Sequence, residues 1–415
     1  MGAGRIIGFL VVVLALILLF SGGVQPLWSV SFADDDYPVL TRVSNDFNLL
    51  VSRDASVTVF KIRVLSNSGT VLQSFTTDVC DYSNGIGAIA TQDGSVLYLA
   101  GLDISHYNET GAYDSYLEKF TISKEGIVLE WEVKAFTDSY YPVLDISDDG
   151  SYVLYTETSY PGYPMKLYDA NGNLIWSVNT NFDISQLVYY NVYPKISEDG
   201  NYVVAVVDGK LSLFSNSSST PLWQATPDGE VWGWDISSGN VWLLSTPDWN
   251  GTTTYLTHYT LDGIETKFII NKSRPTLLVA KNSLAFVGFG DGTIWTIDTS
   301  GNHLWTITNV EVNPQIKGDQ QLMFSTDGHY MAVAEEGSGF RVIDVATGNT
   351  ITEYSTDRWA VCSISEYGVY SSLAEWGSSN LHFFKNPIAK YPLSVKVIST
   401  RGQPVRNVKI TVEPM

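Results

Sequence analysis

A short sequence pattern recurs along most of this chain of 415 residues. It reads Ser-x-Asp-Gly-x-Tyr between apolar residues, and its clearest copies are Ile146–Tyr155, Ile196–Val206 and Phe324–Ala334. An aliphatic residue followed by tryptophan also recurs, within Asn173–Val178, Pro221–Ala225 and His303–Ile307. A repeat period of about 40–50 residues is typical of solenoids and propellers, in which each repeat forms one structural unit.

The repeat spacing predicts an all-β fold, a single eight-bladed β-propeller. Eight turns that follow an inner strand mark the repeats: Asn45-Asp46, Asp93-Gly94, Asp149-Gly150, Asp199-Gly200, Ser238-Gly239, Lys281-Asn282, Asp327-Gly328 and Tyr367-Gly368. They lie about 39 to 56 residues apart, the length of one four-stranded blade. The first, fifth, sixth and eighth turns are degenerate, so a seven-bladed propeller stays open as the alternative. The Asp-Gly turns predict type I′ hairpins, which need a positive φ at both central residues.

The two ends of the repeat array complete one another. The last repeat, which ends at Asn380–Asn386, lacks the outer strand that carries an aliphatic-Trp pair. That strand is present at the other end of the chain, within Gln25–Val30. We therefore expect Leu27 and Trp28 to close the ring as the outer strand of the last blade, which removes open sheet edges.

The first 24 residues have the pattern of a targeting segment, for which a hydrophobic helix is expected. Arg5 precedes an apolar run from Ile6 to Phe20, and small residues follow it. The run suits a signal-peptide core and is short for a spanning helix of about 20 residues. Cleavage as a signal peptide and retention as an N-terminal membrane anchor both stay open. In either case Arg5 directs the rest of the chain across the membrane, so we expect an extracytoplasmic protein, secreted or anchored to the outer face.

Charge and sequons fit an exported glycoprotein. The chain has 44 acidic and 24 basic residues, a formal charge of −20, which repels phosphate backbones and argues against a nucleic-acid partner. Four Asn-x-Ser/Thr sequons predict glycosylation at Asn108, Asn216, Asn250 and Asn271.

The residues that most often carry catalysis or metal binding show no supporting pattern. The two cysteines, Cys80 and Cys362, form no Cys-x-x-Cys pair, and they are either buried thiols or a disulfide. The five histidines are scattered, without metal-ligand spacing. Asp145–Gly150 is acidic but lacks the spacing of a calcium loop and predicts a structural turn. We therefore predict no catalytic residue, no cofactor and no metal site.

The segment Phe286–Trp305, FVGFGDGTIWTIDTSGNHLW, resembles the repeat of quinoprotein-like (PQQ-like) propellers. The Ser-x-Asp-Gly copies are equally similar to WD40-like and TolB-like propeller repeats. Together these resemblances cover residues 25–388 and imply the propeller fold, which hosts many functions. Quinoprotein dehydrogenases bind a quinone and calcium on the propeller axis, and many carry a vicinal cysteine pair that this chain lacks. The resemblance extends to non-catalytic PQQ-like propellers that serve as assembly scaffolds at cell envelopes.

A third region, residues 389–415, breaks the repeat. Tyr391–Met415 has two alternating segments around Arg401–Pro404 and resembles the opening hairpin of a carboxypeptidase-regulatory-like β-sandwich. Two strands cannot bury a core alone. Either the chain is a piece of a longer surface protein, or the hairpin docks on the propeller or on a partner. This stretch is locally basic, with Lys396, Arg401, Arg406 and Lys409.

These patterns favour an exported, non-catalytic propeller that binds or scaffolds an unknown protein or glycan at the cell surface. Tyr160, Tyr163 and Trp249 lie in aromatic, polar loops, and tyrosine and tryptophan anchor interfaces well, so we expect partner contacts there. The alternatives are an exported enzyme with a propeller core, quinone-dependent or carbohydrate-active, and a structural component of a surface layer.

Overall fold

The computed structural model describes most of the chain as strands and turns. The described residues are 24–32, 36–54, 59–80, 87–103, 114–137, 142–156, 164–180, 193–247, 252–310, 322–335, 339–358, 360–375 and 380–387. Within these ranges no helical segment has the length and apolar character needed to cross a bilayer. The predicted targeting segment (apart from Val24) and the predicted C-terminal hairpin lie outside them.

Within the described ranges, six four-stranded antiparallel sheets repeat along the chain. The first two comprise β10 (Val143–Ile146), β11 (Tyr152–Thr156), β12 (Pro164–Asp169) and β13 (Leu174–Asn179), then β14 (Lys195–Ile196), β15 (Tyr202–Val207), β16 (Lys210–Ser215) and β17 (Trp223–Ala225). The next two comprise β18 (Glu230–Ser237), β19 (Asn240–Thr246), β20 (Thr254–Thr260) and β21 (Glu265–Ile270), then β22 (Pro275–Lys281), β23 (Leu284–Phe289), β24 (Thr293–Ile297) and β25 (His303–Thr308). The last two comprise β26 (Leu322–Phe324), β27 (Tyr330–Glu335), β28 (Gly339–Asp344) and β29 (Thr350–Tyr354), then β30 (Ala360–Ile364), β31 (Tyr370–Glu375), β32 (Asn380–Lys385) and β1 (Trp28–Ser31).

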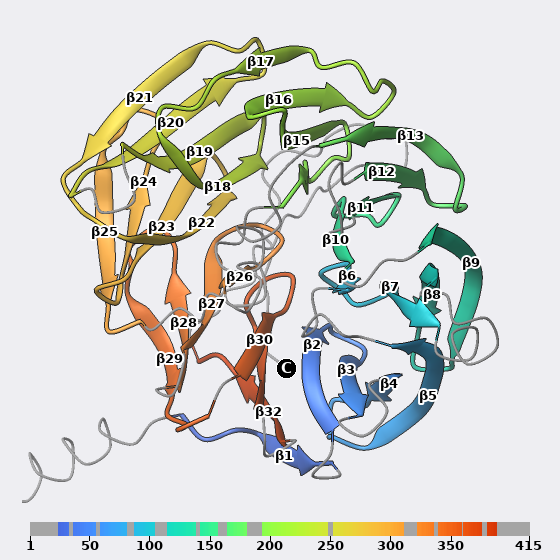
Figure 1. Cartoon of the computed structure of the whole chain (residues 1–415). Helices are drawn as coiled ribbons and strands as arrows, with labels where there is room; N and C mark the ends of the chain where they lie inside the picture. Colours follow the sequence, from blue (N-terminus) through green and yellow to red (C-terminus); the bar gives the residue numbers. More distant parts are fainter. Residues whose placement is uncertain are drawn as a thin grey trace, which may run out of the picture.

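The N-terminal part of the array forms one larger sheet of eight strands. Its first four are β2 (Asp36–Val43), β3 (Asn48–Asp54), β4 (Val59–Leu65) and β5 (Val71–Cys80). The others are β6 (Ala88–Ala90), β7 (Val96–Asp103), β8 (Asp114–Ile122) and β9 (Ile127–Thr137). The two groups are joined where Val79 and Cys80 pair with Asp103 and Leu102. Figure 1 shows all the sheets arranged around a common centre.

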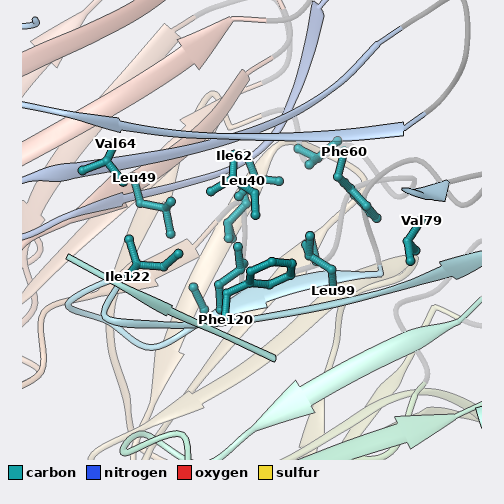
Figure 2. Packing of buried hydrophobic residues seen from close by; sticks show 14 of the residues in the cluster. Leu40, Leu49, Phe60, Ile62, Val64, Val79, Leu99, Phe120 and Ile122 are labelled. Atoms are coloured by element: carbon teal, nitrogen blue, oxygen red, sulfur yellow. The ribbon is translucent and has the colours of Figure 1, made fainter. Parts of the chain in front are cut away.

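The hydrophobic core lies between neighbouring sheets. One cluster, shown in Figure 2, joins strands of the first group with β7 and β8, and Leu49, Phe60 and Phe120 in it are fully buried. A sheet covered on both faces favours strands that are apolar at successive positions rather than alternating. The run Val203–Val207, in which every residue is buried, has this character.

Recurrent tryptophans on several outer strands join one group of strands to the next. The indole N–H of Trp305 donates to the carbonyl of Val345 at 2.9 Å, and that of Trp223 to Leu261 at 3.0 Å. Each ring lies on a glycine of the neighbouring turn: a Cβ added to Gly348 would be 2.8 Å from Trp305. Trp28, Trp131 and Trp176 donate to the backbone in the same way. These rings therefore pack between neighbouring repeats.

The two ends of the array meet in one sheet. β1 pairs antiparallel with β32, placing Trp28 opposite Phe383, and the two rings stack with centroids 5.0 Å apart. The backbone N–H of Leu27 donates to the carbonyl of Phe383 at 2.7 Å, while its side chain is 57% exposed. On the inner side, the hydroxyls of Thr41 on β2 and Ser372 on β31 lie 2.9 Å apart. The first and last sheets are thus in direct contact.

All eight marker turns join the first two strands of a four-strand group, but the expected turn type is wrong for the Asp-Gly copies. Only the glycine has a positive φ in those copies, 66° at Gly150, for example. The Asp149 carboxylate accepts hydrogen bonds from the Ser147 hydroxyl (2.8 Å) and the Ser151 N–H (2.9 Å). These hydrogen bonds close a loop of four residues, which is longer than the two-residue loop of a type I′ hairpin. Positive φ at both central residues occurs instead at Ser238-Gly239.

Candidate functional site

The first strands of successive groups surround a central cavity of about 150 Å³. Four charged side chains at equivalent positions of these strands line it, Arg42, Asp145, Lys195 and Asp235, and each is at most 8% exposed. Sequence reasoning missed their common location. The available signal was a charged residue two positions before the turn serine in an otherwise apolar strand, as in Asp145-Ile-Ser and Asp235-Ile-Ser.

Two of these carboxylates connect one inner strand to the next. Asp145 accepts a hydrogen bond from the backbone N–H of Ile196 at 2.9 Å, and Asp235 accepts one from Ala280 at 2.7 Å. Burial raises the pKa of Asp235 to about 6, although the nearby charge of Lys195 opposes the shift. The buried carboxylates therefore fasten neighbouring strands, and Asp235 changes its charge near pH 6.

A second cavity of about 270 Å³ lies where the inner strands end in turns, and we name it the channel mouth. Its lining consists of Thr91, Gln92, Asp93, Ser95, Asp148, Asp149, Lys281, Thr326 and Glu366. Thr91, Gln92, Asp148 and Lys281 also line the central cavity, so the two are continuous. Among the described side chains that line the mouth, four are carboxylates and one is a cation, a formal charge of −3.

Lys281 is held by two carboxylates at this point. Its ammonium group lies 2.8 Å from Glu198 and 3.7 Å from Asp148. Burial lowers the pKa of Lys281, but Asp148 and Glu198 outweigh it, so the net shift is upward. Burial raises the pKa of Asp148, an effect that Lys281 partly offsets. The side chain of Asp148 is still 52% exposed, so its carboxylate is accessible from the solvent.

Exposed apolar side chains occur at outer strands around the ring, among them Leu222, Ile269 and Leu304, and seven of them lie on the outer strands of three adjacent groups. We name this surface the apolar belt; it consists of Val71, Leu72, Phe75, Val128, Leu129, Leu174 and Ile175, which are 37–54% exposed. The three strands β5, β9 and β13 are linked by two hydrogen bonds. The side chain of Gln73 donates to Glu125 at 3.3 Å, and Trp131 donates to Ala170 at 2.8 Å. Figure 1 shows β5, β9 and β13 following one another along the outer edge of the molecule.

Two of the four predicted glycosylation sites lie in the described part of the chain. Asn271 is exposed directly after β21. Asn216 is half-buried in the turn after β16, where its backbone N–H donates to Asn201 at 2.8 Å. The remaining predicted site residues, Asn108, Tyr160, Tyr163, Trp249 and Asn250, lie outside the described residues.

The sequence leaves open whether the two cysteines form a disulfide, and it predicts no metal site. Cys80 and Cys362 are both buried thiols, which is the thiol alternative rather than the disulfide. Burial raises the pKa of Cys362 to about 12. In the described part of the chain, no group of three or more His, Cys, Asp or Glu side chains is placed to hold a metal ion.

Comparisons with known proteins identify the architecture. A model of the anaphase-promoting complex subunit 4 WD40 domain matches residues 279–368. Among solved structures, BamB from Moraxella catarrhalis aligns with 89% of this chain and 100% of its own, at 14% identity and a TM-score of 0.56. The C-terminal WD40 domain of Sif2 aligns with 88% and 100%, at 11% identity and a TM-score of 0.58.

The computationally designed Ika8 protein aligns with 87% of this chain and 99% of its own, at 12% identity and a TM-score of 0.59. A search of curated proteins finds no match. At these identities the likeness concerns the fold alone. Together with the strand order, it supports a WD40-like β-propeller. The quinoprotein-like character of the repeat stays a prediction.

Proposed function

We propose that this chain is an exported, non-catalytic binding module built on an eight-bladed propeller that β1 closes. The blade count is supported by eight groups of four strands, counting β1 with β30–β32 and dividing the eight-stranded sheet between β5 and β6. Closure is supported by the pairing of β1 with β32 and by the Thr41–Ser372 contact. Export rests on the sequence of the first 24 residues and on the sequons.

The apolar belt is the observation that carries a protein-binding role. β5, β9 and β13 carry several exposed aliphatic or aromatic side chains. Exposed sheet edges of most proteins are blunted by charge or proline, because an apolar edge is a template for association. Larger exposed apolar surfaces on soluble proteins mark interaction sites. We therefore assign the belt to a protein partner with a complementary apolar strand or face.

The test compares matched variants of the chain, each produced in its native cells. In the first variant, Leu129→Glu and Ile175→Glu place charges in the belt at side chains that are 43% and 37% exposed. The control, Ile264→Glu, places a charge beside β21 at a side chain that is 64% exposed. Substitutions at exposed positions change stability by roughly 0.5 kcal/mol or less, so all forms should fold.

Chemical cross-linking in the native cells then identifies the partners of each form. We expect a partner that is shared by the unaltered chain and the control and lost from the belt variant. A partner set that is the same for all three forms refutes the belt. Protease treatment of intact cells tests export separately, since an extracytoplasmic propeller is accessible to the protease and a cytoplasmic one is protected.

A further inference from the structure

A serine, a histidine and a glutamate lie in line across the sheet that joins the two ends of the array. The pairing of β1 with β32 places Ser29 opposite His382, and the Ser29 Oγ lies 2.7 Å from the His382 Nδ1. The other ring nitrogen, Nε2, lies 3.3 Å from the Oε1 of Glu375 on β31. Figure 1 shows β1 beside β32 at the rim of the molecule. The sheet thus brings a hydroxyl, an imidazole and a carboxylate into contact in that order.

The three side chains differ in their access to solvent. His382 and Glu375 are 7% and 5% exposed, whereas Ser29 is exposed on the edge strand β1. The interaction between the imidazole and the carboxylate is therefore shielded from water, which strengthens it. The hydroxyl of Ser29 can still be reached by a molecule in solution.

The surroundings of His382 orient its imidazole ring. A carboxylate beside Nε2 favours the proton on that nitrogen, so the lone pair of Nδ1 accepts the hydrogen bond from the Ser29 hydroxyl. The second oxygen of Glu375 accepts a hydrogen bond from the side-chain amide of Asn380 at 3.3 Å. The ring of Tyr354 on β29 packs on the other part of the imidazole, with ring centroids 5.1 Å apart. A hydroxyl bonded to a base that a third group orients is the arrangement of an activated nucleophile.

We propose that Ser29 is a covalent modification site that takes an acyl group from an activated ester, with His382 as the general base and Glu375 as a positioning residue. The Ser29 Oγ attacks the acyl carbon and gives its proton to Nδ1. The bond from the acyl carbon to the leaving oxygen breaks, and the imidazolium returns the proton to that oxygen, so the products are a serine ester and a free alcohol or phenol.

The ester stays on Ser29, so the chain is modified once and needs no turnover. The inference is independent of the partner proposed for the apolar belt, which lies on β5, β9 and β13. Sequence reasoning missed the site because Ser29 and His382 are 353 positions apart.

A second serine on the same strand supplies an internal control. Ser31 is also exposed, but its hydroxyl donates to the side-chain oxygen of Asn380, which is not a base. The complete chain is treated with p-nitrophenyl acetate, and peptide mass spectrometry follows acetylation of both serines in one sample. We expect Ser29 to react about 100-fold faster than Ser31, since a positioned general base contributes roughly 10²–10⁴-fold. Hydroxylamine should remove this acetyl group, because it cleaves a serine ester and leaves the amides formed on lysines.

Two variants separate the roles of the base and the carboxylate. His382→Gln should slow Ser29 to the rate of Ser31. Glu375 and Tyr354 are titratable groups that face His382, and of these the carboxylate stabilises the protonated imidazole. Glu375→Gln should therefore lower the pH at which acetylation of Ser29 is half-maximal, whereas the loss of a purely structural contact would leave that pH unchanged.

The comparison of the two serines in the unaltered chain does not depend on whether any variant folds. Equal rates at Ser29 and Ser31 would overturn the proposal. So would a rate at Ser29 that His382→Gln leaves unchanged. An unchanged pH dependence in Glu375→Gln, with the variant melting as the unaltered chain does, would overturn the role of the carboxylate.

Discussion

The contact between Trp305 and Gly348 allows a quantitative test of how adjacent sheets are joined. Gly348 has a φ of +73°, and a Cβ there would lie 2.8 Å from the indole ring. Gly209 has nearly the same φ, +74°, but nothing lies within 4 Å of its added Cβ. Substituting alanine at either glycine therefore has the same backbone cost, because both lie in the left-handed region. Only at Gly348 does the added Cβ also clash with a side chain, the ring of Trp305. That backbone cost is about 1 kcal/mol.

The free energy of unfolding should separate the two contributions. We expect Gly209→Ala to cost about 1 kcal/mol and Gly348→Ala about 2–3 kcal/mol, because crowding a packed ring adds about 1–2 kcal/mol. Trp305→Ala alone should cost about 2–3 kcal/mol, since the half-buried ring also loses its hydrogen bond to Val345. In the Trp305→Ala background the extra cost of Gly348→Ala should vanish.

Urea denaturation of the four proteins and the double variant measures these differences as one cycle. A coupling energy of about 1–2 kcal/mol between Trp305 and Gly348 is the expected result. Equal losses in the free energy of unfolding for Gly209→Ala and Gly348→Ala would refute the packing argument, because the Trp305 ring would then move aside at no cost. An extra cost that persists without the indole would locate the strain in the turn backbone instead.

Four further measurements follow from the structure. Deleting residues 25–32 removes β1 and should lower the melting temperature by many degrees; an unchanged melt contradicts closure. Because burial raises the pKa of Asp235 to about 6, the folded state holds its proton above pH 3.8, and the resulting stability is lost as pH rises from 4 to 6. Asp235→Asn should remove up to about 3 kcal/mol of that dependence in urea titrations at several pH values. A thiol reagent at pH 8 should label Cys80 and Cys362 only after denaturation, since both are buried. Deglycosylation of the native protein should change its mass, and Asn271→Gln should remove one glycan from it.

The sequence predicts the repeat well because the same local interactions recur in each copy. In Ser147-Asp-Asp-Gly150 the serine hydroxyl accepts the N–H of Tyr152 at 3.1 Å. That tyrosine packs on Gly200 of the next turn, where a Cβ would be 2.5 Å away. Each residue type is thus required by a contact within five residues or with the neighbouring repeat. Such short-range requirements leave a pattern that a single sequence shows.

The central charges and the channel mouth were not predictable in the same way. Asp145, Lys195 and Asp235 are near one another only because three inner strands, about 40–50 residues apart in sequence, meet around the cavity. Nothing in the spacing of one strand says which charges face it across the ring. The turn type was predicted incorrectly for a related reason. Hydrogen bonds from Ser147 and Ser151 to the Asp149 side chain stabilise a turn other than type I′, and the Asp-Gly pair alone does not reveal these bonds.

Within the Ser-x-Asp-Gly repeat, the serine, aspartate and glycine stabilise the turn, whereas the x position does not. In Ser-x-Asp-Gly the serine, aspartate and glycine are all engaged in the turn, so they carry little freedom to vary. The x position is different, because its side chain takes no part in the serine–aspartate bonds and lies at the mouth or the adjoining cavity. In the copies of this chain it is Gln92, Asp148, Glu198, Thr326 and Glu366. Asp148 and Glu366 are two of the four carboxylates at the mouth, and the turn residues Asp93 and Asp149 are the other two. The charge at this end of the ring is therefore set in part by positions that the serine–aspartate bonds do not constrain, and Glu366→Gln should make the mouth less acidic while those bonds stay in place.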